Sequence, residues 1–291
     1  MSKTTVVYIW PNWEFYLARA VAPEATYLAA EPGDTCESIL HRLTPDCECF
    51  WFHLDATITT KFPSERPALL AALSKRGIQA LNGEVLDISK RCLHKFSREH
   101  GFVDVSAAEA GDPDELIIVK TDYNSRGSTE RELTESDQAL LGLPHDSAAP
   151  VDFQYHVGPR SSIDPSAWKN PALVCERFIR NDYGIWYRAF IRRPKMFVAQ
   201  FRAAAPIKKD AKSVLLEITR LRTDDNSTMS NKIASMILRF ADAFRLDFGA
   251  LDIVTDLNGV AAVVDVNPTP WNGQRAALFQ HLVDVTAYFK E

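Results

Sequence analysis

Two apolar runs joined by Asn258-Gly259 constrain the fold of this chain more than any other feature. The runs cover residues 248–254 and 260–266, and each is long enough to form a strand buried in a sheet. Asn-Gly between apolar runs is the strongest short-range hairpin signal, because both residues tolerate the positive φ angles of a type I′ turn. The segment therefore predicts two antiparallel strands joined by a two-residue turn.

The predicted turn determines which polar residues of the hairpin face each other. If Leu257 pairs with Val260, Asp252 lies directly opposite Asp265, and Asn267 points to the same face because side chains alternate along a strand. Opposed carboxylates repel each other, and charge within apolar strands is costly. Bound Mg²⁺ would remove both costs, since it prefers oxygen ligands. The hairpin thus predicts a metal site; the alternative is a polar, solvent-facing side of an edge hairpin.

The first 80 residues alternate between short apolar runs and helical patterns, which is typical of a parallel sheet covered by helices. Strands are expected at 5–10, 26–29, 49–54 and 78–81, and helices at 14–22, 35–43 and 67–76. Further along, helices are expected at 88–99, 231–244 and 276–289, and strands at 116–120, 174–178, 185–192 and 196–203. The predicted class is α/β with α+β lobes. Residues 123–170 are rich in Ser, Asp, Pro and Gly, so we expect a mobile lid there.

The composition is that of an ordinary globular protein. The chain has 291 residues, 46% of them hydrophobic and 24% charged, which suits two domains or one large domain with a lid. The net charge of -5 argues against a protein that wraps nucleic acid, and no stretch reaches the roughly 20 apolar residues of a membrane helix. The five cysteines are scattered and odd in number, so we expect no disulfide framework and a reducing, cytoplasmic location.

An apolar strand that ends in lysine marks a second candidate site. Lys120 closes the run, and a lysine at a strand end can reach a phosphate group. The next loop contains Ser125, Gly127 and Ser128, whose backbone N–H groups suit phosphate oxygens. Arg188 lies on a later predicted strand, where it could bind a phosphoryl group; the alternative is a surface ion pair. Each of these signals is common by itself, and none is a Walker A motif.

Taken in this order, the segments resemble the ATP-grasp superfamily between about Leu81 and Asn272. The resemblance is greatest to the ligases that join amino acids or peptides to a carboxylate, including the ribosomal-protein glutamate ligases. It implies an ATP-grasp fold, with a small preceding α/β domain over 1–83 and an ATP-grasp domain over 84–291. Within the latter it implies a lid subdomain at about 116–172 and a metal-binding lobe at about 173–291.

By position, the resemblance implies that Lys90 and Lys120 contact the ATP phosphates and that 125–128 closes over them. The segment 176–179 is similar to the hinge whose backbone holds adenine, and Asp182 is placed like the acid that binds ribose. Arg188 matches an arginine that faces the γ-phosphate and the substrate, so Arg188 and Lys120 are the expected catalytic residues. The expected ATP-binding residues are Lys90, Lys120, Ser125, Gly127, Ser128, Glu176, Arg177, Phe178, Ile179 and Asp182.

Two departures from the family pattern affect the site. The second metal acid is usually glutamate, whereas this chain has Asp265. The loop has a single glycine, Gly127, so Ser125 and Ser128 must take tight backbone positions. The implied cofactors are ATP and two Mg²⁺ ions, with Mn²⁺ as the alternative metal. The implied metal ligands are Asp252, Asp265 and Asn267.

The resemblance implies a carboxylate–amine ligase that forms an amide or peptide bond through an acyl phosphate and releases ADP and phosphate. The alternatives are an ATP-grasp kinase that phosphorylates a hydroxyl and a non-catalytic ATP-binding protein. The expected partners are small-molecule or peptide carboxylates and amines, with no nucleic acid or membrane partner and a homodimer as the assembly. Arg202, Arg220 and Arg222 lie on or near predicted strands and could bind an acidic substrate; the alternative is solvated strand-face arginines.

Overall fold

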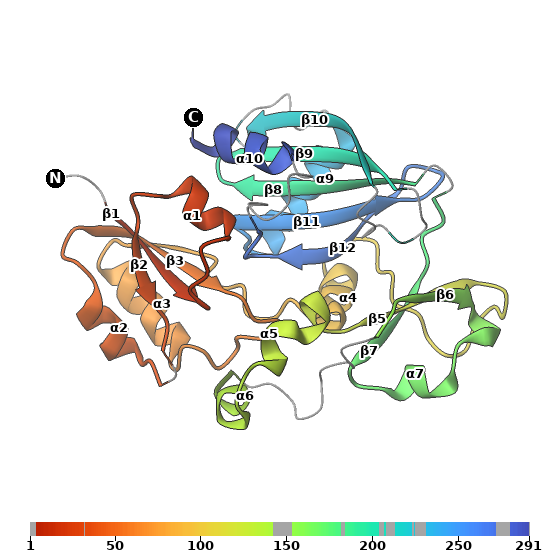
Figure 1. Cartoon of the computed structure of the whole chain (residues 1–291), viewed down its shortest axis with the longest axis horizontal. Helices are drawn as coiled ribbons and strands as arrows, with labels where there is room; N and C mark the ends of the chain where they lie inside the picture. The colour runs from red at the N-terminus through yellow and green to blue at the C-terminus, as the bar shows by residue number, and fades with distance from the viewer. Residues whose placement is uncertain are drawn as a thin grey trace.

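The N-terminal part of the chain forms a parallel sheet in the order β2-β1-β3-β4, as the alternating pattern predicted (Figure 1). The computed structural model describes residues 4–31, 33–141, 153–181, 184–203, 207, 213–222, 224, 231–271 and 280–290. The first elements are β1 Thr4–Trp10, α1 Leu17–Val21, β2 Thr26–Ala29, α2 Cys36–Arg42, β3 Cys47–Leu54, α3 Arg66–Lys75 and β4 Gln79–Leu81. Tyr8, Phe50 and Phe52 pack with α2 and α3, whereas Val7 and Trp51 belong to a second core toward α1 and the C-terminal lobe.

The middle of the chain contains a three-stranded antiparallel sheet in the order β6-β5-β7. Its elements are α4 Lys90–Glu99, β5 Leu116–Thr121, η1 Asn124–Gly127, α5 Ser128–Arg131, α6 Glu135–Leu141, β6 His156–Pro159, η2 Arg160–Ser162, α7 Pro165–Lys169 and β7 Leu173–Arg177. The segment predicted as a lid therefore contains short helices and a strand in its described parts. Its mobility stays a prediction.

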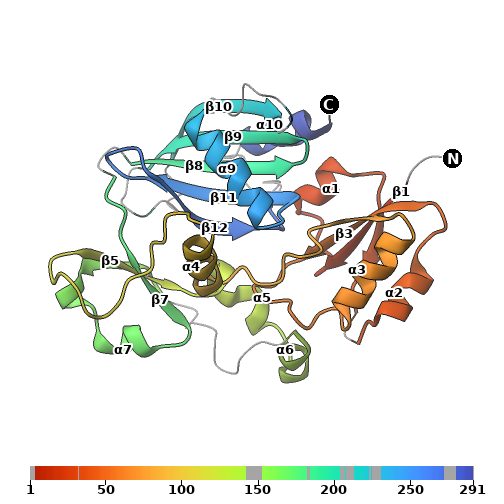
Figure 2. The ribbon, with the colours of Figure 1, turned by 180° about the vertical axis from the view of Figure 1, so that it is seen from behind.

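The C-terminal lobe is a five-stranded antiparallel sheet in the order β10-β9-β8-β11-β12. Its elements are β8 Ile185–Arg192, β9 Lys195–Arg202, β10 Val214–Arg222, α9 Lys232–Ala243, β11 Phe248–Thr255, β12 Ala261–Asn267 and α10 Gln280–Lys290. Helix α9 covers one face of this sheet (Figure 2). Along β8, Ala189 and Ile191 pack in the core under α9, whereas Trp186 and Phe190 pack in the opposite core with α10. Because strand side chains alternate, Arg188 lies on the face turned away from α9.

One asparagine joins the N-terminal sheet to this lobe. The Asn82 side chain donates to the Phe248 carbonyl oxygen at 2.8 Å and accepts from the N–H groups of Asp247 and Phe248 at 2.9 and 3.1 Å. The Asn82 N–H also donates to the Asp247 carboxylate at 2.8 Å. Asn82 is 1% exposed, so these bonds form a buried link between β4 and β11.

The first predicted helix differs from the observed one. A helix was expected at 14–22, but α1 begins only at Leu17, because Tyr16 is extended and forms an isolated antiparallel bridge with Trp271. Tertiary contact therefore overrides the helical pattern of the preceding residues. The other predicted helices and strands are present within four residues of the expected bounds, and residues 276–279 of the last predicted helix lie outside the described residues. Within the described residues, none of the helices combines the length and apolar character that a membrane crossing requires.

Candidate active site

Asp252 and Asp265 are directly opposed in the β11–β12 pair, as the hairpin pattern predicted. On its other side, Asp252 pairs with Arg188 of β8. The three charged residues therefore form a row across three neighbouring strands. The row lies on the sheet face turned away from α9, because Arg188 shares the face of Phe190.

The predicted two-residue turn of this hairpin is wrong. Gly259 has a φ of 77°, but Asn258 is not among the described residues with positive φ, which a type I′ turn requires. Instead, the Asp256 carboxylate accepts from the N–H groups of Asn258 and Val260 at 2.9 and 2.8 Å, which builds a longer turn. The strand pairs beside the turn are shifted by one residue, and a bulge at Val264 restores the predicted opposition of the two aspartates.

Each of the two opposed aspartates has a protein cation as partner. The Arg188 guanidinium approaches Asp252 with Nε at 2.8 Å from Oδ1 and Nη2 at 3.3 Å from Oδ2. Lys90, the first residue of α4, places Nζ at 2.6 Å from Asp265 Oδ1. Asp252, Asp265 and Lys90 are all buried. Charge compensation in the apolar strands therefore does not by itself require a metal ion, which corrects one premise of the sequence argument.

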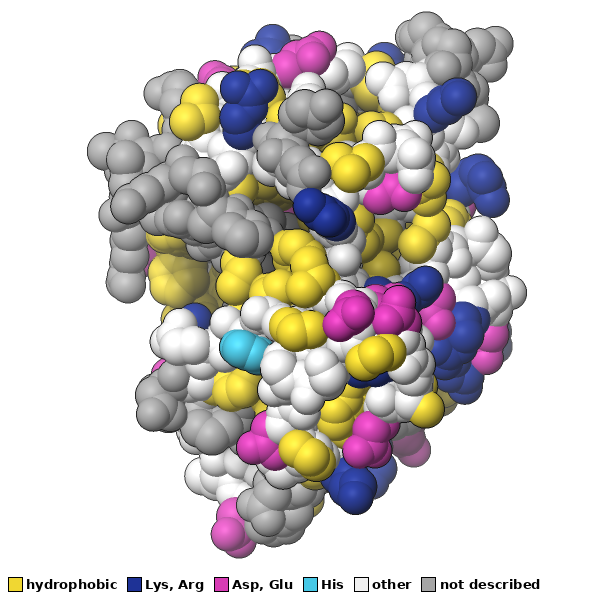
Figure 3. Space-filling model, turned by 90° about the vertical axis from the view of Figure 1, so that its right-hand side faces the viewer, with side chains coloured by type: hydrophobic (Ala, Val, Ile, Leu, Met, Phe, Trp, Pro, Cys, Tyr) yellow, Lys and Arg dark blue, Asp and Glu magenta, His cyan; other side chains and the backbone are white. Residues whose placement is uncertain are grey.

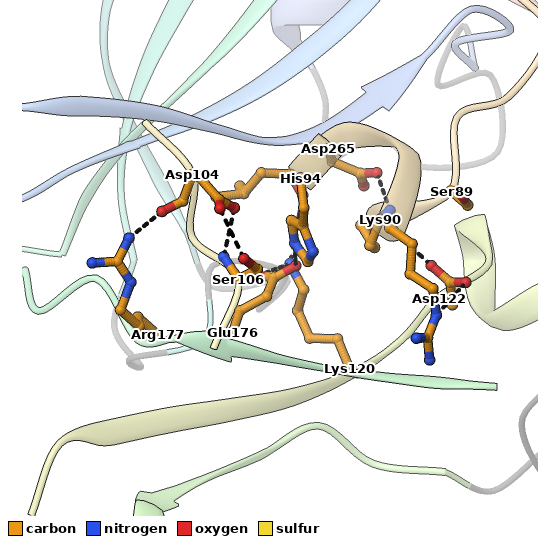
Figure 4. A network of polar contacts seen from close by, with 12 residues as sticks. Ser89, Lys90, His94, Asp104, Ser106, Lys120, Asp122, Glu176, Arg177 and Asp265 are labelled. Carbon is orange, nitrogen blue, oxygen red and sulfur yellow. Dashed lines mark hydrogen bonds and ion pairs between the residues drawn. The ribbon is translucent and has the colours of Figure 1, made fainter. Parts of the chain in front are cut away.

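Glu176 lies at the centre of a second buried network, shown in Figure 4. Lys120 of β5 places Nζ at 2.6 Å from Glu176 Oε2, and His94 of α4 places Nε2 at 3.0 Å from Oε1. All three side chains are buried. Burial alone would raise the pKa of Glu176, but the Lys120 charge and the His94 hydrogen bond outweigh it and lower the pKa to about 2. Glu176 is therefore a carboxylate that holds Lys120 in place.

Helix α4 supplies two of these contacts from one face. Lys90 and His94 are four residues apart, so they lie on the same side of the helix, together with buried Leu93 and Ser97. The sequence analysis identified Lys90 and missed His94. The helical spacing from Lys90 is the signal that could have found it, because a residue four positions along a helix lies on the same face.

The predicted phosphate loop contains a left-handed turn. Ser125, Arg126 and Gly127 have φ angles of 47°, 63° and 69°. Ser125 and Ser128 were both expected to take tight backbone positions. This is confirmed for Ser125 but wrong for Ser128, which has a helical φ of -61° and is the first residue of the short helix α5. Arg126, and not Ser128, is the second non-glycine residue with a left-handed φ, because the left-handed turn consists of three consecutive residues.

The predicted adenine hinge, residues 176–179, begins with the last two residues of β7. The N–H groups of Arg177 and Phe178 donate to the carbonyl oxygens of Val105 and Leu116 at 2.7 and 2.8 Å. Ile179 packs against a small apolar cluster that contains Ala262 and Val264 of β12. A hollow with hydrophobic side chains lies between the sheet of β5–β7 and the sheet of β8–β12 in the space-filling view (Figure 3). Asp182, the predicted ribose ligand, lies outside the described residues.

The three arginines predicted to bind substrate lie away from the row of charges. Arg202 ends β9, and Arg220 and Arg222 lie on β10, the edge strand farthest from β12. All three are exposed, and Arg222 binds Asp224 at 2.8 and 2.9 Å. Their role in substrate binding stays a prediction.

The chemistry of the predicted metal donors fits Mg²⁺. The set consists of two carboxylates and the Asn267 amide oxygen, all hard oxygen donors on neighbouring positions of one hairpin. Asn267 Oδ1 accepts from the Thr269 N–H at 2.9 Å and from the Thr269 hydroxyl at 3.3 Å, and these bonds orient the amide. The described residues include no group of three or more His, Cys, Asp and Glu that could hold a metal, so phosphate oxygens or water would have to complete the shell.

No known protein-family profile matches the chain, and no curated protein sequence matches it. Among solved structures, the D-alanine–D-alanine ligase of Bacillus anthracis is similar over 100% of this chain and 94% of its own, at 12% identity and a TM-score of 0.50. The ATP-grasp ligase PsnB, solved with a phosphomimetic variant of a minimal precursor, Mg and ADP, is similar over 99% of both chains, at 11% identity and a TM-score of 0.50. The chain therefore has the ATP-grasp fold that the sequence resemblance implied. At this identity the similarity establishes the fold, and the activity must be argued from the residues.

Proposed function

We propose that this chain is an ATP-dependent ligase that phosphorylates a carboxylate and joins it to an amine. The observation that carries the proposal is the row formed by Arg188, Asp252 and Asp265, with Lys90 and Lys120 beside it. On this fold, such a set supplies both the cations for phosphate oxygens and the carboxylates for a divalent metal. The D-alanine–D-alanine ligase of similar fold makes a carboxylate the first substrate to test.

The chain's own cations are oriented before any nucleotide binds. Glu176 holds the Lys120 ammonium, and Asp265 and Asp252 hold Lys90 and Arg188. Arg188 is about one-third exposed, so its guanidinium can turn toward a phosphoryl group while the two lysines stay in the interior. Positive groups held in a water-poor site stabilise charge that develops on a transferred phosphoryl group, because they need little reorganisation.

Two Mg²⁺ ions on Asp252, Asp265 and Asn267 would supply additional positive charge at the β- and γ-phosphates. In the proposed reaction, an oxygen of the substrate carboxylate attacks the γ-phosphorus, and ADP leaves with the electron pair of the broken bond. The amine then attacks the acyl carbon, phosphate leaves, and the amine nitrogen loses a proton. Arg188 would bind the transferred group in the first step. The turn that contains Ser125 and Gly127 would exclude water from the acyl phosphate.

A hydroxylamine assay tests this proposal. Purified protein is incubated with Mg-ATP, pooled amino acids, short peptides and hydroxylamine, and ADP and hydroxamate are measured. ADP together with hydroxamate is the expected result, because hydroxylamine traps an acyl phosphate. A phosphorylated product without hydroxamate would identify the alternative, a kinase that acts on a hydroxyl.

Two variants of the same hairpin test the metal role, and urea denaturation checks that Asp265→Asn, which also removes the partner of Lys90, remains folded. Asp265→Asn removes a proposed ligand, whereas Asp256→Asn makes the same change in the turn and keeps an acceptor for its two N–H groups. We expect Asp265→Asn to abolish ADP formation and Asp256→Asn to retain it. Activity of Asp265→Asn within threefold of the unmodified protein would refute the ligand assignment.

A further inference from the structure

The left-handed turn of the predicted phosphate loop is bound at both ends to a single residue, Thr57. Thr57 follows β3 in the N-terminal part of the chain. Its Oγ1 accepts from the Asn124 N–H at 3.0 Å, and its own N–H donates to Glu130 Oε1 at 2.6 Å. Thr57 and Glu130 are 2% and 3% exposed, so water does not compete for these bonds. One residue of the N-terminal domain thus closes a ring around residues 124–130.

An apolar contact reinforces this attachment. Leu133, three residues beyond Glu130, packs against the N-terminal core that contains Phe52 and Leu69. Gln138 donates through Nε2 to the Glu130 carbonyl oxygen at 3.2 Å, which holds the segment after α5. Figure 1 shows α5 between the N-terminal sheet and β5. The loop therefore docks on the N-terminal domain through hydrogen bonds and a core contact.

The backbone of the turn needs such support. Ser125 and Arg126 both take left-handed φ angles, which non-glycine residues adopt only where the surrounding structure compensates the cost. On the other side, Asn124 Nδ2 lies 3.5 Å from the Val266 carbonyl oxygen, next to the proposed metal ligand Asn267. The turn is thus held between the N-terminal domain and the metal-binding hairpin.

Glu130 has an environment that suits a hydrogen-bond acceptor more than a charge. No lysine or arginine of the described chain forms an ion pair with it, and a buried carboxylate without a cation is costly. Burial raises the pKa of Glu130, and the nearby Asp55 carboxylate raises it further. Hydrogen bonds from the N–H and the side chain of Thr57 and from the backbone of Glu130 offset part of this cost. Without Glu130, the Thr57 N–H would remain buried and unpaired.

We infer that Glu130 is a positioning residue which, through Thr57, keeps the turn of Ser125 and Gly127 in the shape that receives the ATP phosphates. The inference rests on the proposed function, since the turn matters to the reaction only if it contacts nucleotide. It makes nucleotide binding depend on a contact between the N-terminal domain and the loop. A ligand that displaces the N-terminal domain would thereby change ATP affinity.

Hydrogen–deuterium exchange of the peptides that cover 123–131, combined with calorimetric titration of Mg-ADP, tests the inference in four variants. Glu130→Leu removes the acceptor of the Thr57 N–H, whereas Glu130→Gln keeps an acceptor oxygen on a side chain of the same length. Thr57→Val removes the acceptor of the Asn124 N–H and the side-chain hydrogen bond to Glu130, and it keeps the Thr57 N–H that donates to Glu130. Glu132→Leu is the matched control, because Glu132 is exposed on the same segment.

We expect exchange in the turn to rise at least about tenfold in Glu130→Leu, as for a buried N–H group that loses its acceptor, with a similar loss of Mg-ADP affinity. Thr57→Val should show a smaller rise at Asn124, and Glu130→Gln and Glu132→Leu should stay within about twofold of the unmodified protein. Unchanged exchange in Glu130→Leu would overturn the attachment. Faster exchange with unchanged Mg-ADP affinity would overturn the positioning role. Absence of Mg-ADP binding in the unmodified protein would instead remove the proposed function, while exchange would still report on the attachment.

Discussion

Replacement of Glu176 by glutamine should destabilise the protein through the positive charge that it leaves behind. Glu176 is 2% exposed, and its carboxylate lies 2.6 Å from the Lys120 ammonium. The lowering of its pKa from 4.5 to about 2 corresponds to about 3 kcal/mol of stability at neutral pH, at about 1.4 kcal/mol for each tenfold change. Loss of one partner of a buried pair typically costs about 3–5 kcal/mol, which agrees with this value. We therefore expect Glu176→Gln to lose about 3 kcal/mol at pH 7.

The same reasoning predicts how a second substitution behaves. Lys120→Met in the Glu176→Gln background removes the uncompensated charge, so the double variant should cost less than the sum of the two single variants, by about 2 kcal/mol or more. Because the folded pKa is lowered, the stabilisation is present above pH 4.5 and is lost as the pH falls toward 2. The Glu176→Gln variant should therefore show a weaker loss of stability across that range.

Urea denaturation followed by tryptophan fluorescence and circular dichroism measures these differences. Glu99→Gln is the matched control, because Glu99 and Lys95 form the same kind of pair on the surface of α4, at 3.9 Å. An exposed pair of this kind contributes about 0.3–0.5 kcal/mol. A Glu176→Gln variant within 1 kcal/mol of the unmodified protein, or single-variant costs that simply add, would refute the account of Glu176 as a compensated buried charge.

Three further predictions concern other sites. Asn82→Ala should cost about 4 kcal/mol, because three side-chain hydrogen bonds at about 1 kcal/mol each are lost and alanine at a φ of 55° adds about 1; Asn82→Gly, which accepts that φ, should cost measurably less. His53 is fully buried, and neither of its ring nitrogens has a hydrogen-bond partner among the described residues. Burial lowers its pKa from 6.5 to about 3, so stability should fall as the pH drops below 6.5. Between pH 7 and pH 5 urea titration should show a loss about 2 kcal/mol smaller in His53→Phe, and equal losses would contradict the prediction. Arg188→Lys should reduce kcat/KM for ADP formation by about 100-fold with little change in stability, since lysine cannot form the two-point contact to Asp252; a loss below tenfold would argue against that contact.

Local pattern was sufficient to predict most of the elements and the pairing of Asp252 with Asp265 in the β11–β12 hairpin. Asp252 faces Asp265 as expected, because a period of two and a strong turn signal leave few choices of register. The same pattern predicted the wrong turn. Asp256 binds two N–H groups and lengthens the loop, and only the bulge at Val264 brings the aspartates back into opposition. The predicted pairing of the two aspartates was thus right, although the turn and the register next to it differ from the prediction.

Contacts between distant residues could not be predicted from spacing along the chain. Lys90 meets Asp265 across 175 residues, and Thr57 meets Glu130 across 73, and no local periodicity encodes either distance. Glu176 was identified by its position in a hinge, but its ionisation depends on Lys120 and His94, which come from other elements. Side-chain alternation and turn chemistry act within a few residues, so they were enough to predict most of the strands and helices. The tertiary structure alone decided which charge compensates which, because electrostatic interactions in a buried site depend on distance in space.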